Sequence, residues 1–148
     1  MSKLDLAYMA GVFDGEGSIM ISKQKPGASN GSISPSYYLR VSLGITDRWI
    51  CELFRFNFGG SIYKKIYRGE KYFPAWVWNL SGERAIRFLK VLLPYFHLKK
   101  AQAELGIKFQ QGKRHFSYGR RKKPVEASVL EEADYILMKA LKREKINE

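Results

Sequence analysis

Residues 8–19 have the sequence YMAGVFDGEGSI, and this short stretch carries more information about the chain than any other. A helix is expected to begin near Asp5, which can cap it, and to end near Gly15. On this helix Ala7, Gly11 and Gly15 recur every four residues, so they lie on one stripe. A stripe without side-chain bulk lets another helix approach closely, which would offset the roughly 1 kcal/mol that a helical glycine costs. That helix could belong to a second copy of the chain or to the chain's own core.

Glu16 lies where this helix is expected to end. A helix C-terminus carries unpaired carbonyl groups and the negative end of the helix dipole, so a further carboxylate is unfavourable there unless it faces a cation. A carboxylate beside free backbone carbonyls is a hard-oxygen site that suits Mg²⁺, with water and phosphate as the remaining ligands. For an isolated D-G-E-G sequence, a solvated turn residue would be the better interpretation.

The rest of the chain alternates between strand-like and helix-like segments. In residues 38–45, Leu39 and Val41 would share one face of a strand, and Arg40 and Ser42 the other. One apolar face and one polar face are typical of an antiparallel sheet that is buried on one side. The expected strands are residues 18–25, 38–45, 61–67 and 72–80, and the expected helices after the first are residues 47–57, 83–93, 98–111 and 125–143.

The element order α-β-β-α-β-β-α-α predicts an α+β fold in a single domain over residues 1–148. Helices would cover the apolar face of the sheet and leave its polar face open. A basic connection at residues 112–124 would lead into the C-terminal helix at 125–143. The lone cysteine, Cys51, excludes an internal disulfide framework and is expected to be a small buried hydrophobe.

The charge of the chain is strongly positive. Lys and Arg number 26 against 14 Asp and Glu, a formal net charge of +12. This excess favours a polyanionic partner, with nucleic acid ranked first and an anionic membrane surface second. The alternative is a basic protein whose charge serves only its solubility. No segment approaches the roughly 18–20 apolar residues of a membrane helix, and no secretion signal is evident. We therefore expect no membrane partner and an intracellular location, in a microbial cytoplasm or an organelle matrix.

The sequence MAGVFDGEG at residues 9–17 resembles the LAGLIDADG signature of the homing endonuclease family. The similarity extends to the first hairpin, the ITDRW sequence at residues 45–49, the second hairpin and PYFHLKKAQ at residues 94–102. The resemblance implies a four-stranded DNA-binding saddle backed by helices. Because only one motif occurs, it also implies a homodimer that pairs its motif helices through Ala7, Gly11 and Gly15.

The resemblance further implies a site-specific double-strand DNA endonuclease, as in intron homing. Such an enzyme would cut a long, near-palindromic site by Mg²⁺-dependent hydrolysis, with Mn²⁺ as a substitute, and would leave short 3′ overhangs. Glu16 matches the metal-binding carboxylate, and Gly15 would offer its backbone carbonyl. Asp14 matches the other acidic position of the motif, where a structural role is expected.

Two further catalytic positions follow from the resemblance. Asp47 matches a polar residue that orients the attacking water, although it could instead merely cap the helix that it begins. Lys99 matches a lysine that balances charge near the scissile phosphate, and Lys100 is an adjacent competitor for this role. Arg48 could reach the same pocket.

Strand alternation predicts which residues of the hairpins would face the major groove of DNA. Arg40 is the best candidate for recognising guanine, because the phase of its strand is unambiguous. The other expected DNA contacts are Ser22, Gln24, Ser42, Lys64 and Trp76.

Other functions are compatible with the same sequence. An RNA-binding intron maturase would use the same scaffold, and a DNA-binding regulator could have lost cleavage. A basic structural protein of a ribonucleoprotein is a third alternative. The combination of Glu16, Asp47 and Lys99 favours the nuclease.

Overall fold

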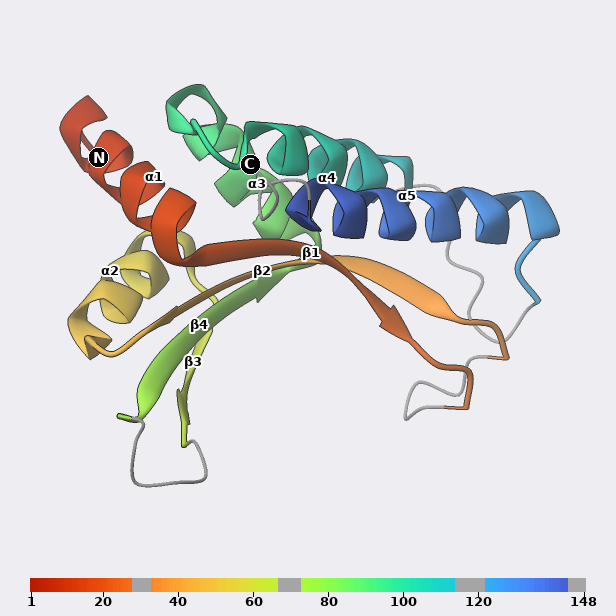
Figure 1. The fold of residues 1–148 in the computed structure, drawn as a ribbon, viewed down its shortest axis with the longest axis horizontal. Coiled ribbons are helices and arrows are strands. Elements are labelled where there is room, and N and C mark those ends of the chain that lie inside the picture. Colours follow the sequence, from red (N-terminus) through yellow and green to blue (C-terminus); the bar gives the residue numbers. More distant parts are fainter. Residues whose placement is uncertain (28–32, 67–72, 114–121, 144–148) are drawn as a thin grey trace.

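The computed structural model describes residues 1–27, 33–66, 73–113 and 122–143 of the chain. This part forms one four-stranded sheet with helices on one side (Figure 1). In chain order the elements are α1 (Lys3–Glu16), β1 (Gly17–Gln24), β2 (Ser36–Ile45), α2 (Arg48–Phe58), β3 (Ser61–Lys65), β4 (Ala75–Ser81), α3 (Gly82–Leu92), the 3₁₀ turn η1 (Leu93–Tyr95), α4 (Lys100–Gly112) and α5 (Val125–Arg143). The predicted α+β order is confirmed, with η1 added before α4.

The sheet is antiparallel throughout, in the strand order β1-β2-β4-β3. Two hairpins, β1–β2 and β3–β4, therefore meet at the central β2–β4 pair. The sheet arches beneath the helices, which pack on its convex side, and the described elements leave its concave side uncovered (Figure 1). This is the half-covered sheet that the alternation of apolar and polar residues predicts.

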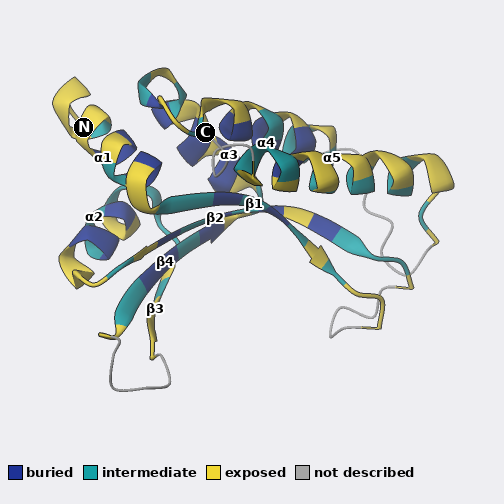
Figure 2. Cartoon of the chain, viewed as in Figure 1, coloured by how far each residue is buried: buried dark blue, intermediate teal, exposed yellow. Residues whose placement is uncertain are grey.

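The hydrophobic core lies between the helices and the convex face of the sheet (Figure 2). Leu39, Val41 and Leu43 of β2 point into it and are fully buried. Phe13 of α1 packs edge-on against Phe88 of α3, with ring centroids 5.0 Å apart. Burying each such side chain stabilises the fold by about 1.5–3 kcal/mol, so α1 is held by its buried face rather than by its own helix propensity.

The start of α1 differs from the prediction. Ser2 caps the helix, because its hydroxyl accepts the backbone N–H of Asp5 at 3.1 Å. The Asp5 carboxylate in turn accepts the backbone N–H of Ser2 at 2.8 Å, which completes a capping box. The expected cap, Asp5, is instead the third residue of the helix.

The C-terminal helix α5 is fastened to the sheet by its carboxylates. Glu132 accepts hydrogen bonds from Lys23, at 2.8 Å, and from the Tyr37 hydroxyl. The hydrogen bond from Lys23 is the main reason that the pKa of Glu132 is lowered. Glu131 pairs with Lys113 and Lys123, which lie near the two ends of the basic connection. Most of that connection, residues 114–121, lies outside the described residues.

Two further expectations concern single features of the chain. Cys51 is buried, as expected, and burial raises the pKa of its thiol. Its Sγ lies 3.6 Å from the carbonyl oxygen of Trp76, so it packs α2 against β4. Among the described helices, none has both the length and the apolar composition that crossing a bilayer requires.

Candidate metal centre and nucleic-acid interface

The C-terminal end of α1 is joined to the start of α4 through the carboxylate of Asp14. One oxygen accepts the backbone N–H groups of His97 and Leu98, at 2.8 and 3.2 Å, and the other accepts that of Lys99, at 3.1 Å. Asp14 is buried, whereas Lys99 at the N-cap of α4 makes no side-chain capping bond of its own. Asp14 therefore caps α4 from another helix. The structural role expected for Asp14 is confirmed, but it closes α4 and not α1.

Lys99 makes a second connection to the same helix end. Its ammonium group donates to the backbone carbonyl of Asp14. The last turn of α1 contains no basic residue, so Lys99 supplies the positive charge that the negative end of this helix favours. Along the chain, the contacted carbonyl is immediately followed by Gly15 and Glu16. The structure thus brings Lys99 to the segment that holds the expected metal-binding residues.

Gly15 and Glu16 are both exposed at the end of α1. The helix ends without a loop, because Gly17 is its C-cap and is already extended, with φ −82° and ψ 165°. A Cβ at Gly17 would lie 2.4 Å from the ring of Phe13, which Phe54, Phe88 and Phe96 enclose. Only glycine permits this close approach, which sends the chain from α1 straight into β1.

Asp47 caps α2 through its side chain. Its Oδ1 accepts the backbone N–H of Trp49 at 2.8 Å, so the capping role that the sequence predicts is confirmed. The β1–β2 register pairs Gly17 with Leu43, and Asp47 follows β2 by two residues. The end of β2 therefore lies beside the end of α1. The catalytic role of Asp47 stays a prediction.

The donor set at the end of α1 can be compared with the needs of Mg²⁺. In the described part of the chain no three or more His, Cys, Asp or Glu side chains gather at one point. Glu16 is instead a single exposed carboxylate beside the last backbone carbonyls of a helix. Mg²⁺ is commonly held by one or two carboxylates plus water and phosphate oxygens, so these residues fit part of such a site.

The stripe of small residues on α1 faces solvent. Ala7, Gly11 and Gly15 are exposed, and a Cβ added to Gly11 or Gly15 would meet nothing within 4 Å. The opposite face of the helix, with Met9, Ala10 and Phe13, is the buried one. Packing of the stripe against the chain's own core, one of the two alternatives open from the sequence, is thereby excluded.

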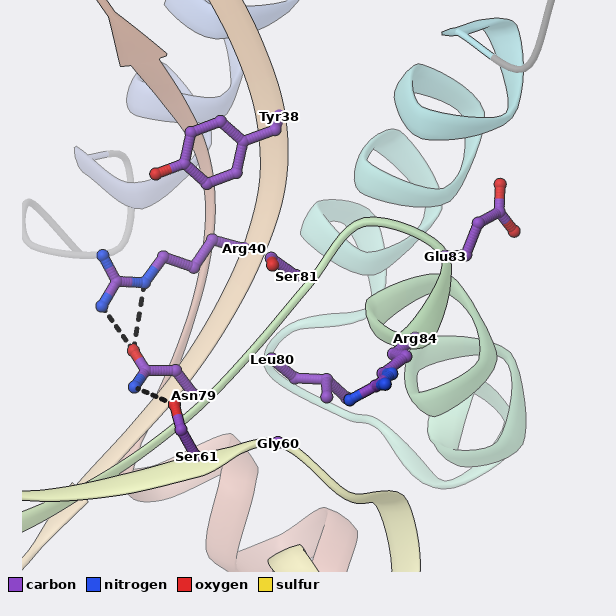
Figure 3. Close-up of a pocket in the computed structure, with 9 residues that line it drawn as sticks. All are labelled: Tyr38, Arg40, Gly60, Ser61, Asn79, Leu80, Ser81, Glu83 and Arg84. Carbon is purple, nitrogen blue, oxygen red and sulfur yellow. Dashed lines mark hydrogen bonds between the residues drawn. The ribbon is translucent and has the colours of Figure 1, made fainter. Parts of the chain in front are cut away.

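The concave face of the sheet carries a polar network centred on Arg40 (Figure 3). Arg40 donates from Nε to Oδ1 of Asn79 at 3.1 Å, and its Nη2 donates to the same atom. Asn79 donates in turn to the hydroxyl of Ser61, at 3.4 Å. The network lies in a hollow of about 690 Å³, lined by Tyr38, Arg40, Gly60, Ser61, Asn79, Leu80, Ser81, Glu83 and Arg84.

The register shows which predicted contacts share this face, because directly opposed residues of antiparallel strands point to the same side. Ser42 lies opposite both Ser18 and Asn79, whereas Arg40 lies opposite Met20 and Ser81. By alternation along β1, Ser22 and Gln24 are also on the concave face. The faces predicted for β1 and β2 are therefore correct.

The faces predicted for β3 and β4 are wrong by one residue. Trp78 lies opposite Leu43 and is fully buried, and Trp76 is two residues away on the same, convex face. Lys64 lies opposite Trp76, so it too leaves the concave face. The physical reason is the size of the indoles: Trp78 fills the core beside Phe54. In their place, Asn79 and Ser61 occupy the concave face.

Trp76 has a neighbour from the expected active-site region. The guanidinium of Arg48 lies over its ring, 4.6 Å from the centroid, and also pairs with Glu52 at 3.0 Å. Sequence reasoning missed Asn79 entirely. It is a single polar residue between Trp78 and Leu80, and no motif in the sequence marks it. Only the side-chain bulk of Trp76 and Trp78 could have indicated the correct phase.

Comparisons with known proteins place this architecture. No family model matches the chain, and no curated protein matches it in sequence. Solved structures do match. The homing endonuclease I-CvuI, in complex with its target, shares 18% identity at a TM-score of 0.73, covering 93% of this chain and 82% of that chain. The archaeal intron-encoded homing endonuclease I-Vdi141I, complexed with DNA, shares 15% identity at a TM-score of 0.58, covering 94% and 97%.

The homing endonuclease I-TnaI shares 13% identity at a TM-score of 0.60, and 93% of each chain is covered. The fold is therefore the α+β fold of these solved structures, with an uncovered antiparallel saddle; I-CvuI and I-Vdi141I were solved with bound DNA. More particularly, the chain has the LAGLIDADG homing endonuclease fold, and its single-domain size fits the single-motif type.

Proposed function

We propose that this chain is a site-specific endonuclease that cuts both strands of DNA as a homodimer with Mg²⁺. The observation that carries the proposal is the end of α1, where an exposed stripe of small residues, Glu16 and the ammonium of Lys99 coincide. Matching homing endonucleases, among them I-CvuI and I-Vdi141I, were solved in complex with DNA, and complexes of I-CvuI contained Ca or Mg. The formal charge of +12 suits a partner of the same kind.

The dimer is supported by what α1 exposes. A two-fold contact along Ala7, Gly11 and Gly15 would let the two helices approach closely, because none of these positions carries bulk. The exposed Leu4 and Tyr8 would add apolar area beside the stripe. Such a contact would bring the two Glu16 carboxylates toward the axis, where like charges require a cation.

The chain's own residues divide the chemistry at this centre. Bound Mg²⁺ would polarise the phosphodiester and stabilise its developing negative charge. Glu16 and the Gly15 carbonyl would hold the metal, and Lys99 would direct its ammonium at the scissile phosphate, with Asp14 fixing the lysine backbone. Asp47 would orient the attacking water while it caps α2. Two such centres across the minor groove would leave short 3′ overhangs.

The concave face would recognise the DNA sequence. Arg40, Ser42, Ser22 and Gln24 lie on it, and an arched antiparallel ribbon can enter the major groove. Asn79 would orient the Arg40 guanidinium and leave further donors for O6 and N7 of a guanine. In a two-fold dimer each contact would occur twice, so the target would be long and nearly palindromic.

A cleavage-selection experiment tests the proposal. The purified chain would be incubated with randomised duplex DNA and Mg²⁺, Mn²⁺ or Ca²⁺, and the cut ends sequenced. We expect one near-palindromic motif, cut on both strands with Mg²⁺ or Mn²⁺. Glu16→Gln, which keeps the shape of the side chain, should abolish cleavage and retain binding. Specific binding without cleavage would make the chain a DNA-binding regulator instead, and equal cleavage by Glu16→Gln would remove Glu16 from the mechanism.

A further inference from the structure

Lys142, near the end of α5, contacts a residue of β1 whose side chain is on the face of the sheet opposite to the helices. Its ammonium group donates to the hydroxyl of Ser18 at 2.8 Å. Ser18 lies opposite Ser42 and shares its concave face, whereas α5 packs on the convex side. Because β1 is an edge strand, the lysine can extend around it. The ammonium group of Lys142 is thereby directed toward the open side of the sheet. The residue that it contacts, Ser18, follows Glu16 by two positions in the chain.

A second ammonium group lies in the same region. Lys99 donates to the carbonyl of Asp14, so two lysines from different helices reach residues 14–18. Burial is the main cause that lowers the pKa of Lys142, and the positive charge of Lys99 lowers it further. The fold thus keeps two like charges near one another at the end of α1, an arrangement that an anion between or beside them would stabilise.

Three other lysines around α5 are paired with carboxylates of that helix. Lys23 pairs with Glu132, and Lys113 and Lys123 pair with Glu131. Among the described residues no carboxylate forms a salt bridge with Lys142. α5 therefore neutralises lysines along its first half and presents a half-buried positive charge near its end.

We propose that Lys142 binds a backbone phosphate of the DNA at the cleavage centre, beside the phosphate that Lys99 serves. Lysine is a point-charge donor suited to phosphate. The hydroxyl to which the Lys142 ammonium donates is on the concave face of β1, and this face would contact the DNA in the arrangement proposed above. The C-terminal helix would then complete the centre that the motif helix begins. The inference rests on the proposed function, because the phosphate is that of the DNA.

The test compares Lys142→Met, which keeps the aliphatic stem, with Lys142→Arg, which keeps the charge. Lys108→Met is the matched control, since Lys108 is exposed on α4 at the helical side of the sheet. On the duplex that the parent protein cuts, single-turnover cleavage by Lys142→Met should fall about 10- to 100-fold, as for the loss of one hydrogen bond to a charged group. Lys142→Arg should retain most of the rate, and Lys108→Met all of it.

A second readout separates phosphate binding from a structural role. The slope of log affinity against log salt concentration should become shallower for Lys142→Met by roughly 0.9 per lost phosphate contact, or about twice that in a dimer. Removing a half-buried charge should not unfold the chain, and Lys142→Gln serves as a second variant if the methionine is poorly tolerated. Ser18→Ala, which removes the hydrogen bond but not the charge, should leave the slope unchanged.

The outcomes distinguish this inference from the proposed function. If the parent protein cuts DNA but Lys142→Met matches it in rate and salt slope, Lys142 is not a phosphate contact and the inference is overturned alone. If the parent binds DNA specifically without cutting, cleavage is lost from the proposed function, but an altered salt slope would still support the phosphate contact. If the parent protein neither binds nor cuts any duplex, both fail together.

Discussion

Lys99 and Asp14 hold each other by two different bonds: the backbone N–H of Lys99 donates to the Asp14 carboxylate, and its side-chain ammonium donates to the Asp14 carbonyl. The two residues are 85 positions apart in the chain. One contact fixes where α4 begins, and the other fixes where the lysine charge lies. The geometry of the proposed cleavage centre and the stability of the fold therefore depend on the same pair.

Asp14→Asn should destabilise the chain. An asparagine side chain is neutral and offers one oxygen, so it cannot accept all three N–H groups at the start of α4. We expect a loss of about 1–3 kcal/mol in the free energy of unfolding, measured by urea denaturation. Asp47→Asn is the matched control, because asparagine caps a helix as well as aspartate does. Equal stability of the two variants would show that the Asp14 contacts contribute little.

The same Asp47→Asn variant separates the two roles of that residue. Its cap should survive, because the amide oxygen can accept from Trp49 as the carboxylate does. If the carboxylate also orients the attacking water, cleavage should fall by about 10²-fold or more with no change in the urea midpoint. A variant that retains both stability and cleavage would reduce Asp47 to a helix cap.

Gly11→Leu should break the dimer without harming the subunit. Nothing lies within 4 Å of a Cβ at this position, and leucine has the better helix propensity. Sedimentation at several protein concentrations should show a monomer, and cleavage should be lost with it. Gly112→Leu adds the same bulk at another open, exposed helical glycine and should leave the association unchanged. A Gly11→Leu protein that remains dimeric would place the interface elsewhere.

Arg40→Ala and Asn79→Ala should relax preference at the same base position of each half-site. The hydrogen bonds from Arg40 to Asn79 make the amide a support for the guanidinium. Selection on a randomised library should show a loss of about 1–3 kcal/mol in discrimination for Arg40→Ala, a smaller loss for Asn79→Ala, and no further loss in the double variant. Effects at separate positions, or simple additivity, would contradict the coupling.

Acid should weaken the attachment of α5. The hydrogen bonds that Glu132 accepts from Lys23 and Tyr37 lower the pKa of its carboxyl below the usual value for a glutamate. A carboxyl group whose pKa is lower in the folded chain than in the unfolded chain stabilises the fold at any pH above its pKa in the unfolded chain. This stabilisation is lost as the pH falls through the pKa in the folded chain. The difference in melting temperature between the parent and Glu132→Gln should therefore be present at neutral pH and disappear well below pH 4.5. Glu104→Gln, which removes one exposed carboxylate from α4, is the control for the loss of one negative charge.

Most of the architecture follows from periodicity and capping residues in the sequence. Residues 38–45 alternate cleanly, so the faces of β2 and the place of Arg40 could be predicted. In β4 both alternating sets contain apolar residues, and the choice between them depends on whether the core has room for Trp78. That room is made by Phe54 and Phe88, which come from other elements.

The site was only partly predictable for a similar reason. The positions of Glu16, Gly15 and Lys99 follow from a motif and from family resemblance, and the structure brings them to one helix end. Asn79 and Lys142 form hydrogen bonds with Arg40 and Ser18, which lie far away in the chain. No local pattern encodes such contacts, because they arise only when the sheet and the last helix have packed.

The direct passage from α1 into β1 has a consequence for how such a protein could change its target. Glu16 ends α1 and Gly17 begins β1, so no loop separates the helix proposed to join two subunits from the strand proposed to enter the groove. Rotating one subunit against the other would swing both reading strands by the same angle. The contact between the two α1 helices would then set the number of base pairs between the half-sites. A new spacing would have to evolve through changes in that contact, whereas new base preferences could evolve one strand residue at a time.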